Sequence, residues 1–154
     1  MKLSVPLSWK QAEGERPHIV QKWTSNAGYG TDVFVLLIEK LPTGLSDADK
    51  QQILSESNAK SIVGANGNVI DFKLSKVETL PVAIVNYSQQ IERLDLSAKI
   101  RGVSYLIIVD NALVTIQMMC MGADKSQSAE DRYDELETLV KAIANSLVIP
   151  SVYR

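Results

Sequence analysis

The chain has 154 residues, 45% of them hydrophobic and 22% charged, which is an ordinary composition for one globular domain. Its formal net charge of −2 argues against a dedicated nucleic-acid binder, because such proteins normally carry a basic patch or stripe. The longest apolar run, Val33–Ile38, is too short to span a bilayer. A single cysteine, Cys120, excludes an internal disulfide and a zinc site built from cysteines.

The N-terminal part of the chain predicts two strands. The first is a short half-buried strand in which Leu3, Val5 and Leu7 alternate with polar residues and Pro6. Because Pro6 has no backbone N–H, we expect an edge strand or a strand end there. The second strand covers residues 19–24, with Ile19, Gln21 and Trp23 on one face.

A loop, a central strand and a helix follow. Residues 25–30 have the composition of a loop, and the continuously apolar Val33–Ile38 predicts a strand covered on both faces. Ser46 and Asp49 form a capping-box pattern, so we expect a helix from there to about Ile62, with Gly64 as its C-cap.

Four further strand segments precede the last helix. Residues 69–77 alternate, with Ile70, Phe72 and Leu74 on one face, and residues 82–87 follow after a Leu-Pro break. Residues 94–109 predict either one long strand with a bulge at Gly102 or two strands. Residues 113–121 should pair back through a two-residue turn at Asp110 and Asn111.

The chain ends in its clearest helix, expected over residues 128–148 between Ser128 and Pro150. Its apolar stripe consists of Tyr133, Leu136, Leu139, Val140, Ile143, Ala144 and Leu147. Together the segments predict one α+β domain over residues 1–154, with an antiparallel sheet of about six or seven strands flanked by two main helices.

The order of these segments resembles the Mog1/PsbP-like fold group, which includes the DcrB-like bacterial envelope proteins. The residues that carry the resemblance are Pro6 and Trp9 in the first segment, the Pro42 turn before the helix, and the paired apolar strands that follow Leu80 and Gly102. The resemblance implies an α/β/α sandwich with binding or accessory roles. It implies no shared reaction and offers no catalytic residues.

The sequence contains few residues suited to catalysis. His18 is the only histidine and has no nucleophile elbow near it, so we interpret it as an exposed or capping residue. Cys120 alternates with Val114, Ile116 and Met118, which predicts a packing residue and not a reactive thiol. Gly28 and Gly30 lack the lysine and further glycines of a phosphate loop. We therefore expect no enzyme, no metal and no cofactor.

Trp9, Trp23 and Tyr29 are the best candidates for contact with a ligand or partner, because aromatic side chains dominate recognition surfaces. The alternative is that both tryptophans cover the edge of the sheet. Met118, Met119 and Met121 raise a similar choice between an adaptable partner surface and core packing, and we favour core packing.

Two interpretations of function follow. The first is a non-enzymatic accessory or binding protein of the cell envelope, whose export signal would be missing from the sequence at hand. The second is a cytoplasmic adaptor or chaperone for a secreted protein, since some DcrB-like proteins are dimeric chaperones for apolar segments. Both imply a protein partner and no nucleic acid, and both leave a homodimer open. An enzyme with an unrecognised site is a third alternative.

Overall fold

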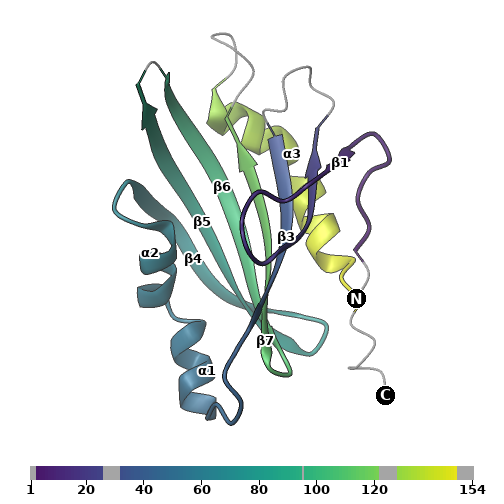
Figure 1. Ribbon diagram of the computed structural model, residues 1–154, viewed down its shortest axis with the longest axis vertical. Helices are drawn as coiled ribbons and strands as arrows, with labels where there is room; N and C mark the ends of the chain where they lie inside the picture. The colour runs from purple at the N-terminus through teal and green to yellow at the C-terminus, as the bar shows by residue number, and fades with distance from the viewer. Residues whose placement is uncertain (1–2, 26–31, 95, 122–127, 149–154) are drawn as a thin grey trace.

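A computed structural model describes residues 3–25, 32–94, 96–121 and 128–148. These residues form a seven-stranded antiparallel sheet with the strand order β1-β2-β3-β7-β6-β5-β4 (Figure 1). The strands are β1 (Lys10–Ala12), β2 (Ile19–Thr24), β3 (Asp32–Lys40), β4 (Gly67–Val77), β5 (Leu80–Arg93), β6 (Leu96–Val109) and β7 (Ala112–Cys120). The helices are α1 (Asp47–Ile53), α2 (Glu56–Val63) and α3 (Ala129–Asn145). The α+β class with an antiparallel sheet is confirmed.

The sheet lies between two helical layers, with α1 and α2 on one face and α3 on the other (Figure 1). Alternating residues of the central strands therefore enter two different cores. Side chains under α3 form the main core cluster, which includes Phe34, Val103, Ile116, Tyr133 and Val140, and side chains under α2 form the second core cluster, which includes Leu54, Ala59, Val85 and Leu113. On β6, Tyr105 and Ile107 belong to the main core cluster, whereas Leu106 belongs to the second core cluster. Successive side chains of a strand point to opposite faces of the sheet. Because both faces are covered here, nearly every position of these strands is apolar.

The central strands pair as the sequence predicts. β6 and β7 meet across a two-residue turn, and Asp110 adopts a positive φ of 52°, which Asp tolerates better than most residues. β6 is one unbroken strand, because its register with β5 runs without a shift through Gly102. No bulge occurs at Gly102. A Cβ atom there would lie 2.5 Å from the ring of Tyr87, so the position requires glycine for close approach.

The predicted strand at Leu3, Val5 and Leu7 is wrong. The described part of this segment makes a turn in which the N–H of Trp9 donates to the carbonyl of Pro6 at 3.0 Å. Leu3 and Val5 pack on the main core cluster, and Leu7 is fully exposed. The N–H of Ser4 donates to Oγ of Ser146 at the end of α3. The alternating apolar residues of this segment therefore pack on the core beside α3 without forming a strand.

The predicted helix over residues 46–62 is two helices. Ser46 and Asp49 form the expected capping box, and Gly64 caps the end with a φ of 81°. The break lies at Ser55, whose hydroxyl donates to the carbonyl of Gln52 and accepts from the N–H of Asn58. The Asn58 amide donates to the carbonyl of Ile53 at 2.6 Å. These side chains give the backbone local partners that compete with a continuous helix.

Two strands contain irregularities that shift their faces. In β4 the register with β5 shifts between Val69 and Asp71, so Ile70 does not keep the expected alternation with Phe72 and Leu74. In β2 the register with β3 shifts between Ile19 and Gln21. A bulge has no distinct signature in either alternating sequence.

The helix α3 is confirmed in its start and its buried stripe. The hydroxyl of Ser128 accepts from the N–H of Asp131 at 3.1 Å. Tyr133, Leu136, Val140 and Ile143 are all buried in the main core cluster. The helix ends at Asn145, and Pro150 lies outside the described residues. None of the described helices is long and apolar enough to cross a membrane.

Candidate functional site

The two tryptophans expected at a contact surface lie near the β1 edge of the sheet. Trp9 precedes β1, and Trp23 lies on β2 opposite Phe34 of β3. The rings of Trp23 and Phe34 have centroids 5.8 Å apart and are tilted by 58°. Both tryptophans pack against the main core cluster and keep part of their surface in solvent. Tyr29 lies outside the described residues.

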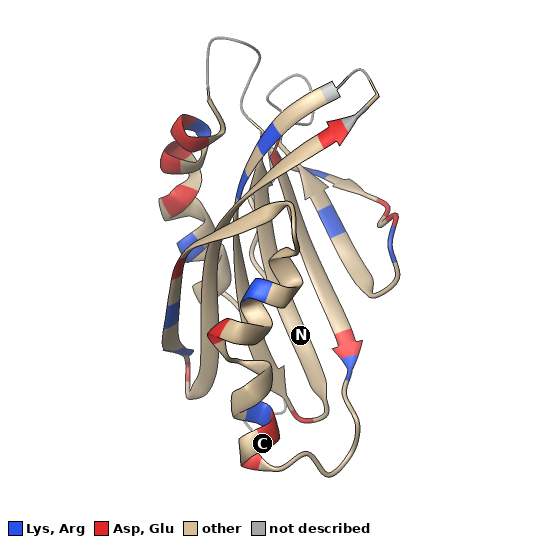
Figure 2. Ribbon diagram, turned by 90° about the vertical axis from the view of Figure 1, so that its left-hand side faces the viewer, with Lys and Arg blue, Asp and Glu red and all other residues tan. Residues whose placement is uncertain are grey.

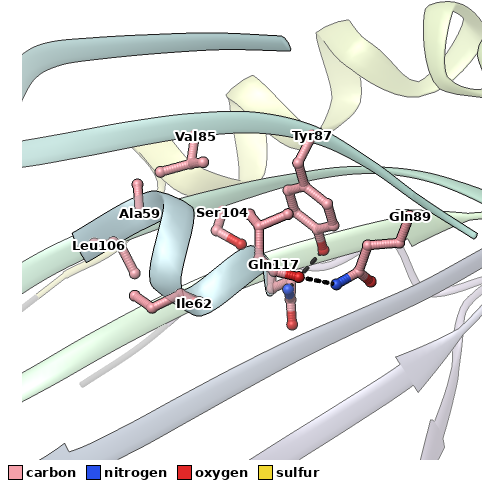
Figure 3. Close-up of a pocket in the computed structure, with 9 residues that line it drawn as sticks. Ala59, Ile62, Val85, Tyr87, Gln89, Ser104, Leu106 and Gln117 are labelled. Carbon is pink, nitrogen blue, oxygen red and sulfur yellow. Dashed lines mark hydrogen bonds between the residues drawn. The ribbon is translucent and has the colours of Figure 1, made fainter. Parts of the chain in front are cut away.

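A second candidate site is a small cavity between α2 and the sheet, with a volume of about 20 Å³ (Figure 3). Its apolar wall comes from α2, β5 and β6, and four polar side chains complete the lining: Tyr87, Gln89, Ser104 and Gln117. A cavity of this size and polarity accommodates one water molecule or one small polar group of a ligand.

Tyr87 is the central polar residue of this cavity. Its side chain is 2% exposed, and its hydroxyl accepts a hydrogen bond from Nε2 of Gln117 at 2.6 Å. Burial raises the pKa of the Tyr87 phenol to about 12, although hydrogen bonds with Gln117 and Ser104 and the charge of Arg16 oppose the shift. The phenol therefore remains protonated at neutral pH and serves as a hydrogen-bonding group, not as a base.

Gln89 links the cavity to the end of α2. Its Nε2 atom donates to the carbonyl of Val63 at 2.8 Å, which satisfies one of the last carbonyls of the helix. Ile62, on the same turn of α2, is 51% exposed at the rim. The cavity thus combines a fixed polar floor with one exposed apolar side chain.

A buried ion pair lies at another end of the sheet, where β3 begins. Asp32 is fully buried, and its Oδ2 atom accepts from Oγ of Ser25 at 2.8 Å and from Nε of Arg132 at 2.8 Å. Oδ1 is buried without a hydrogen-bond partner among the residues that the structure describes. The site joins the start of β3 to the first turns of α3.

Sequence reasoning missed this ion pair, because Asp32 and Arg132 are 100 residues apart along the chain. One signal was present in the sequence. Arg132 is a cation near the start of a helix whose first turn is otherwise acidic, a position that the helix dipole disfavours. A specific carboxylate partner from another element accounts for it.

Cys120 lies beside this ion pair, because it is the cross-strand partner of Asp32. Its side chain is fully buried in the main core cluster, as the sequence predicts. Burial, followed by the negative charge of Asp32, raises the pKa of the Cys120 thiol to about 12. The thiolate that nucleophilic or redox chemistry needs is therefore strongly disfavoured.

The other reactive or adaptable residues are more dispersed. His18 is exposed at the start of β2 with a φ of 70°, and its carbonyl accepts from the N–H of Ile38. Met118 is buried in the main core cluster, Met119 packs partly buried on the second core cluster, and Met121 is 41% exposed. Within the described ranges, no group of three or more His, Cys, Asp or Glu side chains is arranged to hold a metal ion.

Comparison with solved structures identifies the architecture. The solution structure of cyanobacterial PsbP (CyanoP) from Synechocystis sp. PCC 6803 is similar over 94% of this chain and 83% of that chain, with a TM-score of 0.61 and 14% identity. The chain has a PsbP-like fold. The resemblance to the Mog1/PsbP-like fold group is thereby confirmed at the level of architecture.

Two further structures share this PsbP-like fold. PA94, a Pseudomonas aeruginosa protein of unknown function, is similar over 97% of this chain and 85% of that chain, with a TM-score of 0.56 and 12% identity. A protein from Bacteroides thetaiotaomicron VPI-5482 matches 84% of this chain but only 40% of its own length, with a TM-score of 0.51 and 13% identity. No protein-family model matches the sequence, and neither does any curated protein.

Proposed function

We propose that this chain is a non-enzymatic accessory or binding protein of the bacterial cell envelope. The observation that carries the non-enzymatic part is the complete burial of Cys120, the only thiol, with a pKa raised to about 12. The PsbP-like fold supports an accessory role by analogy, and so does the resemblance of the sequence to DcrB-like envelope proteins. A folded domain whose only thiol is used in packing acts most simply by contact.

The proposed contact surface surrounds Trp9, Trp23 and Tyr29. Trp9 and Trp23 each pack one part of the side chain on the main core cluster and present the rest to solvent. Anchored aromatic side chains of this kind contribute large contact areas with little loss of conformational entropy on binding. Tyr29, which lies outside the described residues, is included on the sequence alone, as the third aromatic residue of the N-terminal segment.

The surface is tested by partner capture with single variants at three positions: Trp9→Ala, Trp23→Phe and Tyr29→Ala. Phenylalanine at position 23 keeps an aromatic ring on the strand opposite Phe34, so the fold should be preserved. Leu94→Ser is the matched control, because Leu94 is fully exposed on the β5–β6 hairpin. We expect weaker capture from lysate by at least one of the three variants and unchanged capture by Leu94→Ser. Unchanged capture by all three folded variants would exclude this surface.

The enzymatic alternative is tested separately with a broad hydrolase screen. We expect no turnover by the purified protein. Turnover that His18→Ala abolishes would contradict the non-enzymatic assignment, because His18 is the only histidine available as a general base.

A second candidate function is a cytoplasmic adaptor or chaperone for an apolar segment of a secreted protein. Met121 is 41% exposed at the end of β7, and Met119 is only partly buried on the α2 side of the sheet. Methionine surfaces adapt to different apolar partners. This function predicts that an apolar helical peptide binds the protein and that Met121→Lys weakens the binding. An unchanged affinity would remove Met121 from consideration.

A further inference from the structure

We propose that two copies of this chain associate through the outer edge of β4. The two β4 strands would pair antiparallel about a two-fold axis at Phe72. β4 is the last strand of the sheet, and within the described part of the chain no strand pairs with its outer edge. It has 11 residues, whereas β1 at the opposite edge has only 3. An unpaired edge of this length is a template for another strand.

The β4 edge is only partly protected against such pairing, by Lys73, Lys76 and the bulge at Ile70. It contains no proline, so each of its residues keeps a backbone N–H. Ile70 is 50% exposed and Leu74 is 63% exposed, which are large values for apolar side chains on a strand. The side of the molecule that carries β4, α1 and α2 faces the viewer in Figure 2. A second copy would cover apolar surface that the single chain leaves in solvent.

The charges of β4 are complementary to themselves in one register. In an antiparallel pair with two-fold symmetry, one residue must lie opposite its own copy. When this residue is Phe72, Asp71 of each copy lies opposite Lys73 of the other, which gives two pairs of opposite charges. Phe72 is also the midpoint of β4, so this register overlaps the strand along its whole length.

Neighbouring registers are less favourable. Centring the pair on Asp71, Lys73 or Lys76 would place like charges directly opposite each other, which destabilises cross-strand pairs. Centring it on Leu74 or Ser75 leaves no opposite charges face to face and reduces the overlap. The bulge at Ile70 interrupts the ladder once on each side of the axis and leaves the Asp71 and Lys73 pairs beside Phe72 in place.

The first test is a charge exchange followed by sedimentation velocity over a concentration series. The wild type should dimerise. Lys73→Asp should raise the dimer dissociation constant by about tenfold or more, because both charge pairs become repulsive. The double variant Asp71→Lys with Lys73→Asp should restore dimerisation. Lys76→Asp is the matched control and should not weaken the dimer, because position 76 lies beyond the bulge, opposite the uncharged residues Gly67 and Asn68.

The second test fixes the register with cysteines in a Cys120→Ala background. Phe72→Cys should form an intermolecular disulfide readily, because position 72 lies opposite itself, whereas Leu74→Cys should not. Circular dichroism confirms that each variant is folded. A monomeric wild type throughout the series, equal effects of Lys73→Asp and Lys76→Asp, or faster cross-linking at position 74 would each contradict the proposed interface. Addition of a strand from a different protein at β4 in place of a second copy would contradict it too.

Discussion

Cys120 shows how burial controls the chemistry available to one side chain. It is fully buried, and its pKa is raised to about 12, so almost no thiolate exists in the native state at neutral pH. We predict slow labelling by a thiol reagent in the folded protein and fast labelling after unfolding. In a Cys120→Ala background, Met121→Cys provides the matched control, because position 121 is 41% exposed and should react rapidly. Rapid native labelling of Cys120 itself would reopen a redox or nucleophilic role.

Tyr87 couples protein stability to alkaline pH. Its pKa is raised from the ordinary value of 10.0 to about 12, so the folded state holds the phenolic proton more tightly than the unfolded state does. The resulting stability is fully present below pH 10 and is lost as the pH rises toward 12. From pH 9 to pH 11 the free energy of unfolding should fall by about 1 kcal/mol less in Tyr87→Phe than in the wild type.

Denaturant titration at the two pH values measures the Tyr87 contribution. Tyr133 and Cys120 also have pKa values raised to about 12 by burial, so the variant should retain part of the pH dependence. The lost hydrogen bond with Gln117 lowers stability at both pH values and does not affect the difference. An identical pH dependence in variant and wild type would contradict the assignment.

Asp32 and Arg132 should be strongly coupled, because removing one partner leaves the other charge partly buried. We predict that Asp32→Asn lowers the free energy of unfolding by about 3–5 kcal/mol. The control is the exposed pair Glu137 and Lys141 on α3, where Glu137→Gln should cost at most about 1 kcal/mol. Adding Arg132→Met to Asp32→Asn should cost less than the sum of the single changes. Additive losses would show that the two side chains do not interact.

Elements with strong local signals were predictable from the sequence. The helix α3 has an N-cap at Ser128 and an apolar stripe, and the β6–β7 hairpin has a two-residue turn at Asp110 and Asn111. In both cases the local propensity and the buried pattern agree, so no long-range information is needed.

The elements predicted wrongly depend on competing partners. Leu3 and Val5 alternate like a strand, yet they pack on the core beside α3, because the chain turns at Pro6. The helix after Ser46 breaks because Ser55 is a second N-cap. A single sequence does not reveal which of two compatible local structures tertiary packing selects.

Mutation of the apolar stripe of α3 tests whether this helix packs on the sheet. Leu136 and Ile143 are 9% and 3% exposed in the main core cluster, so Leu136→Ala and Ile143→Ala should each lower the free energy of unfolding by about 2–5 kcal/mol. Thr138→Ala is the control on the exposed face and should change it by at most about 0.5 kcal/mol. Urea titration measures all three variants. Losses below about 0.5 kcal/mol in both core variants would show that the stripe does not pack on the sheet.

At the scale of the whole molecule, the sheet presents two different edges. The β1 edge is short and lies near the half-exposed tryptophans, whereas the β4 edge is long and unpaired among the described strands. The fold class was predictable because it follows from element order. The Asp32–Arg132 pair and the cavity beside α2 were not, because each joins residues from elements far apart in the chain. Such contacts form only when the sheet is assembled, so no local pattern in the sequence indicates them.

The central claim is that this protein acts by contact at the surface around Trp9. The most direct measurement places a photoreactive amino acid at position 9 and, in a separate variant, at the fully exposed position 94 on the β5–β6 hairpin. Both variants are irradiated in cells and their cross-linked products are identified by mass spectrometry. We predict a discrete cross-linked partner from position 9 and none of the same identity from position 94. The same products from both positions, or no product from position 9, would contradict the account.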